Sequence, residues 1–130
     1  MTARLNPCPC GLPYGYPACC GAYHGGAPAP DAQALMRSRY SAYVLGDAAY
    51  LLSTWHASSR PASLDLDSEP RPKWLGLEVK RYEPIDADHA VVEFVARYKV
   101  NGRAFRMQET SRFVRENGRW FYVDGDVAGV

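Results

Sequence analysis

Apolar residues recur at helical spacing between residues 31 and 46. The stripe that predicts a helix here consists of Ala32, Met36, Tyr40, Tyr43 and Val44. Asp31 follows Pro30 and suits an N-cap, because its side chain can accept a hydrogen bond from the first helical turn. Gly46 suits the end of the helix, where a left-handed backbone conformation is common.

A second, shorter helix is predicted over residues 48–56, with Asp47 as its cap. Its expected inner face consists of Tyr50, Leu51, Thr54 and Trp55. Residues 57–73 contain three prolines and four serines and predict a long connection, with one short helix within residues 63–67.

The remainder of the chain alternates apolar and polar residues with the period of a β-strand. The segments 74–83, 90–100 and 103–115 and the stretch after residue 118 predict about four antiparallel strands. Asn-Gly at 101–102 and again at 117–118 is typical of tight hairpin turns. The expected inward residues are Leu75, Leu77, Val79, Val92, Phe94, Ala96, Tyr98, Val100, Phe105, Met107 and Phe113. The order indicates an α+β fold with two to three helices packed on one face of a curved sheet.

The first thirty residues have a different composition. They contain 5 Gly, 6 Pro and no acidic residue, so they cannot form a helix or a sheet with its own core. A unit this short usually needs a metal, disulfides or a host surface. We therefore predict two parts, a small motif over 1–26 and an α+β domain over 27–130.

All four cysteines of the chain lie in this first part, at Cys8, Cys10, Cys19 and Cys20. Two close thiolate pairs on a turn-rich loop suit tetrahedral zinc, and four thiolates leave no open coordination position. The spacing therefore predicts one structural Zn²⁺. Disulfides, for which three pairings exist, and a redox or labile metal site are the alternatives. His24 lies four residues after Cys20 and is either a substitute ligand or a neighbour that hydrogen-bonds a ligand sulfur.

The stretch "CPCG…CCG" resembles the SEC-C motif, a zinc element found at the end of the bacterial translocase motor SecA and in other proteins. The motif usually reads CPCGSG, whereas this chain has Leu12-Pro13 after Gly11, where we expect any distortion of the site to arise. The stretches "ALMRSRYSAYVLGDAAYLLSTWH", "WLGLEV" and "ETSRFVRENGRWFYVDG" are similar to the YchJ family of uncharacterised bacterial proteins. That resemblance implies a nuclear-transport-factor-2-like cone behind the zinc motif.

Such a cone can enclose a pocket, although function must be argued from the residues of the site. Strand parity places Glu109 and Ser111 inward, and a carboxylate among aromatic residues needs a partner. The candidate partners are Arg39 and His56. Other residues expected near the same space are Trp55, Tyr98, Trp120 and Tyr122. Glu109 and His56 are acid–base candidates, but a structural Arg39–Glu109 ion pair, a helix-capping His56 and a purely aromatic core explain the same residues.

Basic residues gather on the predicted hairpins. They are Arg97, Lys99, Arg103, Arg106, Arg112, Arg115 and Arg119, opposed between 97 and 119 by Glu109 and Glu116. Exposed charges of this kind protect a sheet from aggregation, or they form a patch for RNA, the ribosome or an acidic protein. Parity places Arg106 and Arg112 on the outer face.

The net charge of +1 excludes the strong overall bias of a dedicated nucleic-acid binder. The sequence contains neither a signal-peptide pattern nor an apolar run that predicts a membrane span, so we expect a cytoplasmic protein without a membrane partner. The leading hypothesis is a non-enzymatic protein that docks a protein partner through its zinc knuckle. The alternative is a small-molecule-binding protein or an enzyme that uses the interior of the cone.

Overall fold

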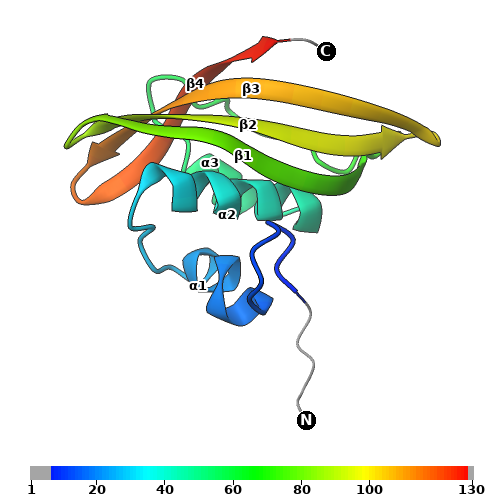
Figure 1. The fold of residues 1–130 in the computed structure, drawn as a ribbon, viewed down its shortest axis with the longest axis horizontal. Coiled ribbons are helices and arrows are strands. Elements are labelled where there is room, and N and C mark those ends of the chain that lie inside the picture. Colours follow the sequence, from blue (N-terminus) through cyan, green and yellow to red (C-terminus); the bar gives the residue numbers. More distant parts are fainter. Residues whose placement is uncertain (1–6, 129–130) are drawn as a thin grey trace.

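Two helices cover one face of a curved antiparallel sheet (Figure 1). The computed structural model describes residues 7–128. Helices α2 (Ala32–Leu45) and α3 (Ala48–Ser53) precede strands β1 (Lys73–Asp86), β2 (His89–Val100), β3 (Arg103–Glu116) and β4 (Arg119–Ala128), which lie in the order β1-β2-β3-β4. The predicted α+β fold is confirmed.

Local capping determines where both helices begin and end. The backbone N–H of Ala34 donates to Asp31 Oδ1 at 2.7 Å, and Gly46 ends α2 with a φ of 75°. Asp47 accepts in the same way from the N–H of Tyr50 at 3.1 Å. These caps lie where the sequence predicted them.

The second helix is shorter than predicted. It ends at Ser53 and not at residue 56, because the chain after it pairs with β4: Tyr122 N–H donates to Thr54 O, and His56 N–H donates to Tyr122 O. The helix predicted within residues 63–67 is wrong as well. There, Asp65 Oδ1 accepts from the N–H groups of Asp67 and Ser68 and forms a local turn instead.

Both Asn-Gly pairs form the predicted hairpin turns. Asn101 and Asn117 have φ values of 52° and 53°, and the glycines that follow them have 78° and 77°. Two consecutive residues with positive φ match the twist of the flanking strands, and few residues other than Asn and Gly tolerate this conformation. The first turn joins β2 to β3, whose register is continuous, and the second joins β3 to β4.

Strand β1 departs from the predicted alternation. Its pairing with β2 shifts between Trp74 and Gly76, and Leu75 is 47% exposed. The prediction of an inward Leu75 is therefore wrong, because a bulge turns Trp74 toward the helices in its place. Leu77 and Val79 pack against the core as expected. Phe105 is 36% exposed and stacks on Tyr98 at 5.4 Å.

The cysteine-rich segment lies on the opposite side of α2 from the sheet (Figure 1). It contains a single turn of 3₁₀ helix (Tyr16–Ala18) and helix α1 (Cys20–His24). Helix α2 is consequently the middle of three layers. The predicted division of the chain between residues 26 and 27 stays a prediction.

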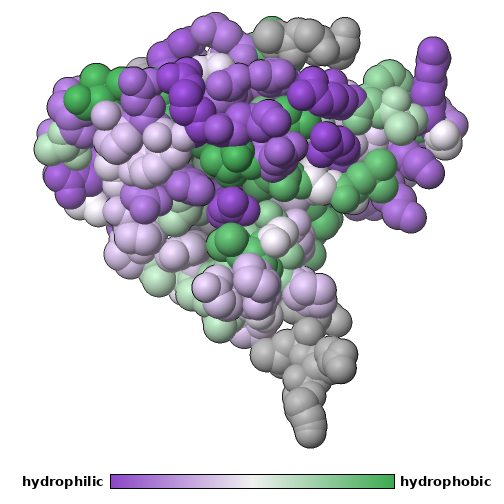
Figure 2. All heavy atoms as spheres, in the orientation of Figure 1, coloured by the Kyte–Doolittle hydropathy of each residue, from purple (hydrophilic) through white to green (hydrophobic). Residues whose placement is uncertain are grey.

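The surface differs between the layers. Hydrophilic side chains gather over the sheet, whereas the surface around the cysteine-rich segment is mostly of intermediate hydropathy (Figure 2). Within residues 7–128, no helix combines the length and the apolar character needed to cross a membrane.

Candidate functional site

Four buried thiols converge below α2. The Sγ atoms of Cys8, Cys10, Cys19 and Cys20 all lie within 4.8 Å of one another, and none of these residues is more than 9% exposed. All four thiols are free, so the structure contains no disulfide among them. The Sγ atoms of Cys10 and Cys19 are 3.7 Å apart. Zinc–sulfur bonds of about 2.3 Å give a tetrahedron whose sulfur–sulfur edges are about 3.8 Å, so the thiols fit a four-coordinate metal ion.

The backbone of this segment brings the cysteines together. Cys8 N–H donates to Tyr14 O at 2.9 Å and closes a tight loop. Gly11 lies within this loop and has a φ of 94°. Gly21 permits a second close approach, because a Cβ there would lie 2.7 Å from Tyr16 O. Leu12 packs against the cysteines. The four thiols therefore lie close together even though Leu12-Pro13 follows Gly11 in place of the usual Ser-Gly.

Hydrogen bonds among the thiols shift the pKa values of Cys10, Cys19 and Cys20. Hydrogen bonding from Cys20 lowers the pKa of Cys10 to about 5 against the opposing effect of burial. Burial raises the pKa of Cys19 to about 12, and the hydrogen bond to Cys10 raises the pKa of Cys20 strongly. One thiolate is thus stabilised at the expense of its neighbours. A bound cation removes this competition, because it stabilises all four thiolates together.

His24 lies beside the cluster and is not among its four grouped ligands. Tyr16 Oη donates to His24 Nδ1 at 2.5 Å, and His24 Nε2 donates to the carbonyl of Ser38 at 2.8 Å. Both ring nitrogens are therefore engaged with groups other than sulfur. The histidine attaches α1 to α2, and its ring lies 4.5 Å from the ring of Tyr50.

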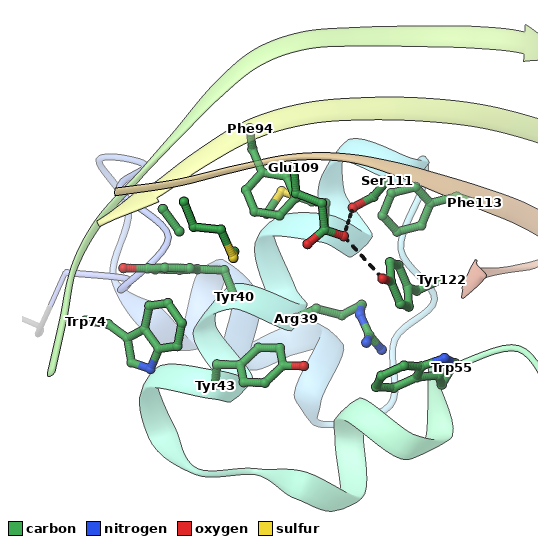
Figure 3. Close-up of a pocket in the computed structure, with 13 residues that line it drawn as sticks. Arg39, Tyr40, Tyr43, Trp55, Trp74, Phe94, Glu109, Ser111, Phe113 and Tyr122 are labelled. Atoms are coloured by element: carbon green, nitrogen blue, oxygen red, sulfur yellow. Dashed lines mark hydrogen bonds between the residues drawn. The ribbon is translucent and has the colours of Figure 1, made fainter. Parts of the chain in front are cut away.

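A cavity of about 270 Å³ lies on the other side of α2, beneath the sheet (Figure 3). Its walls come from α2, from Trp55 after α3 and from all four strands. Most of the lining is apolar or aromatic, with a few polar side chains. The lining residues are Met36, Arg39, Tyr40, Tyr43, Trp55, Trp74, Phe94, Ala96, Met107, Glu109, Ser111, Phe113 and Tyr122.

Arg39, the cation in this cavity, has no acidic partner within residues 7–128. Arg39 is 6% exposed, and its Nη1 donates to Leu51 O at 2.8 Å and to Thr54 Oγ1 at 2.7 Å. Its guanidinium carbon lies 5.0 Å from the centre of the Trp55 ring and 4.6 Å from that of Tyr122. Burial lowers the pKa of Arg39. Aromatic faces and backbone oxygen thus replace a counter-ion.

The carboxylate in the cavity is held by hydroxyl groups. Glu109 Oε2 accepts from Ser111 Oγ at 2.7 Å and from Tyr122 Oη at 3.2 Å, as Figure 3 shows. Burial, followed by the charge of Glu109, raises the pKa of Tyr122. The expected Arg39–Glu109 ion pair does not form among the described residues. The two groups instead share Tyr122, whose ring packs against Arg39 and whose hydroxyl donates to Glu109.

Seven residues were predicted to line a pocket, and three of them do not line this cavity. The four that do are Arg39, Trp55, Glu109 and Tyr122. His56 lies outside, where its Nε2 is 2.8 Å from Glu116 Oε2 and its Nδ1 is 2.7 Å from Ser58 Oγ. Tyr98 packs between Trp74 and Phe105. Trp120 lines a separate hollow beside α1 and α3. The proposed acid–base pair is consequently split, because Glu109 faces the cavity and His56 does not.

Sequence reasoning missed several lining residues. Trp74 was hidden by the bulge in β1, and Tyr40 and Tyr43 were assigned to the core because they belong to the apolar stripe of α2. Gly125 was missed too. A Cβ there would lie 2.9 Å from Glu109 Cδ, so the glycine makes room for that carboxylate. The strand parity that placed Glu109 inward is the signal that identifies Gly125 as well, since it pairs with Ser111.

The basic residues on the hairpins are partly neutralised. Arg112 forms exposed ion pairs with Asp124 and Asp126. Arg115 pairs with Asp88, and Arg97 lies 3.8 Å from Glu78. The hydrogen bonds that Arg112 donates to Asp126 and Asp124 raise the pKa of Arg112. An RNA or ribosome surface on this face stays a prediction.

Comparison with known proteins covers most of the chain. The family described as "YchJ, middle NTF2-like domain" matches residues 31–125. A UPF0225 protein of Polaromonas naphthalenivorans is 59% identical over 93% of this chain and 97% of its own length. One from Xanthomonas campestris pv. campestris is 58% identical over 92% of this chain and 93% of its own length.

Two solved structures are similar as well. The solution structure of a SEC-C motif containing protein from Rhodopseudomonas palustris superposes with a TM-score of 0.83 at 31% identity and covers 95% of this chain and 100% of the other. The crystal structure of a SEC-C motif containing protein from Psychrobacter arcticus gives 0.79 at 30% identity, with 96% and 84% covered.

Proposed function

The chain belongs to the YchJ family, and we propose that it binds a small organic molecule in the cavity of its nuclear-transport-factor-2-like domain. The observation that carries this proposal is Arg39, a buried cation that lines an apolar cavity and has no acidic partner in the described part of the chain. Burying a charge without a counter-ion is costly, and apolar residues of similar size usually stabilise a core at least as well. A ligand is the simplest reason to keep the guanidinium there.

The cavity has the composition of a binding site. At about 270 Å³ it lies just below the usual range for ligand pockets, which begins at ~300 Å³. Mostly aromatic walls with a few polar groups are typical of such sites. Binding without turnover fits the arrangement better than catalysis does, because His56, the predicted acid–base partner of Glu109, lies outside the cavity.

Protein-observed NMR with a fragment library tests the proposal. We expect small aromatic fragments to shift the amide resonances of cavity-lining residues. Ala96→Leu fills part of the cavity and is expected to abolish these shifts, because Ala96 lines it and is 1% exposed. Ala104→Leu is the control, since Ala104 is exposed on the neighbouring strand. Fragments that bind elsewhere, or equally well to both variants, would contradict the proposal.

We also propose that the cysteine cluster binds one Zn²⁺ and that this ion is structural. Four buried thiols with tetrahedral spacing support it, and four protein ligands leave no position for substrate. Native mass spectrometry of reduced protein is expected to show one zinc ion per chain. A mass without metal, after purification in the absence of chelator, would contradict this.

A second candidate function is the docking of a protein partner through the zinc knuckle, residues 7–26. The observation in its favour is Tyr14, which is 58% exposed at the tip of the knuckle between the exposed Pro13 and Pro17. Exposed aromatic side chains are frequent at interfaces. Tyr14→Ser is expected to abolish recovery of a partner from lysate while zinc content stays unchanged. Equal recovery of the same proteins by both forms would contradict a docking role.

A further inference from the structure

The two charged groups of the cavity keep unused hydrogen-bonding capacity. Arg39 uses Nη1 for its two hydrogen bonds, and its Nε and Nη2 groups have no partner among the described residues. Glu109 accepts both of its hydrogen bonds at Oε2, and Oε1 accepts none from the described residues. The cavity therefore offers free N–H donors on one wall and a free carboxylate oxygen on another.

These groups also set the charge that the cavity accepts. One guanidinium and one carboxylate line it together. An anionic ligand meets Arg39 favourably but is repelled by Glu109, and a cationic ligand has the opposite difficulty. In a site with few water molecules these interactions are stronger than at the surface. The balance favours a ligand without net charge.

The other residues that line the cavity indicate the chemical character of the rest of the ligand. Tyr40, Trp74 and Phe94 line the part of the cavity away from the guanidinium, and Figure 3 shows their rings around the same space. Rings of this kind pack well against a flat apolar surface. The small volume restricts the ligand to one or two rings.

We propose that the ligand is a small uncharged aromatic molecule that carries a hydrogen-bond acceptor next to a donor, as in a carboxamide. The acceptor takes hydrogen bonds from Arg39, and the donor bonds Glu109 Oε1. This inference rests on the proposed binding function and specifies its ligand class.

Three probes of nearly the same shape test the charge preference. Benzamide is neutral and carries both groups, benzoate is its anionic counterpart, and benzamidinium is its cationic counterpart. We expect benzamide to bind the full chain with a Kd of about 1 mM, which is usual for a fragment. Benzoate and benzamidinium are expected to bind at least about tenfold more weakly. NMR titration of cavity amides measures all three.

One variant tests how much the Glu109 charge contributes to this preference. Glu109→Gln keeps the shape and an acceptor for Ser111 and Tyr122 but removes the negative charge. We expect it to improve benzoate binding by about tenfold, a gain that damage to the fold does not produce. Glu116→Gln is the matched control, because Glu116 contacts His56 outside the cavity and its replacement should leave all three affinities unchanged.

The outcomes separate this inference from the function on which it rests. If benzoate or benzamidinium binds in the cavity as tightly as benzamide, the ligand class is wrong and the binding function stands. The inference is also overturned if Glu109→Gln leaves benzoate binding unchanged. If none of the three probes shifts the lining residues, while Ala96→Leu and Ala104→Leu respond identically to the fragment library, the binding function itself is refuted.

Discussion

The Glu109 carboxylate occupies space that is available only because a glycine lies beside it in β4. Gly125 pairs with Ser111 across the β3–β4 ladder, and a Cβ at this position would lie 2.9 Å from Glu109 Cδ. The φ of Gly125 is not positive, so its backbone conformation suits alanine. Gly125→Ala therefore acts through the clash alone, and the Glu109 side chain has to move.

The expected size of the effect follows from the contacts that are lost. When Glu109 moves, it loses the hydrogen bonds from Ser111 and Tyr122, and bonds to a charged group contribute about 1.5–3 kcal/mol each. The Tyr122 bond is long at 3.2 Å, so we use the lower part of that range. Alanine in a strand gains about 0.5–1 kcal/mol over glycine. The net loss of unfolding free energy is about 2–3 kcal/mol.

Urea denaturation followed by tryptophan fluorescence measures this loss. Gly76→Ala is the control, because nothing lies within 4 Å of a Cβ there and the backbone of Gly76 is also unstrained. It is expected to leave stability unchanged or slightly raised. The decisive comparison is Gly125→Ala in a Glu109→Ala background, where the clash is gone and the substitution should cost almost nothing. A loss of the same size in both backgrounds would refute the reasoning.

Three further predictions concern the metal, the buried cation and the surface. Cys10→Ser is expected to abolish zinc binding and to remove the NMR dispersion of residues 7–26 while residues 31–128 stay folded; a collapse of the whole spectrum would show that the two parts fold together. Arg39→Lys keeps the charge but loses the planar fork and its stacking, so we expect urea denaturation to show about 2–3 kcal/mol less stability, and an unchanged midpoint would contradict the role of those contacts. Arg112→Gln is expected to leave the urea midpoint unchanged at both low and high salt, because its ion pairs with Asp124 and Asp126 are exposed; a salt-dependent loss of stability would show that the pairs matter.

Local signals in the sequence were sufficient for most of the fold. The helix caps at Asp31 and Asp47 and the hairpin turns at Asn101 and Asn117 depend on a few consecutive residues, and each appears where it was predicted. The resemblance to the YchJ family, and with it the nuclear-transport-factor-2-like domain, is confirmed by the family match over residues 31–125. The cysteine spacing likewise predicted a cluster, because all four ligands lie on one short segment.

The interior of the cavity depends on contacts between distant segments, and here the sequence was a weaker guide. A one-residue bulge reversed the facing of Leu75 and Trp74, as any such shift does in a strand. Arg39 was expected to pair with the nearest inward acid. It instead bonds the carbonyl of Leu51 and packs against Trp55 and Tyr122, partners that become available only because α3 ends early and the chain turns along β4.

Helix α2 connects the two candidate sites, and its sequence shows why. Small residues on the knuckle side, Ser38, Ser41 and Ala42, are fully buried and let the cysteine-rich segment approach closely. Cys8 Sγ lies 3.6 Å from Ser41 Oγ, and Arg37 donates to Cys10 O at 2.9 Å. The adjacent Arg39 and Tyr40 face the cavity.

A metal ion that fixes the cysteines therefore also fixes one face of the helix whose other face forms the cavity wall. Because the knuckle side of α2 is small and partly polar, its exposure costs far less than exposure of an apolar face would. We therefore expect the domain to stay folded without the metal, and a bound metal to hold α2, and with it the cavity wall, more tightly.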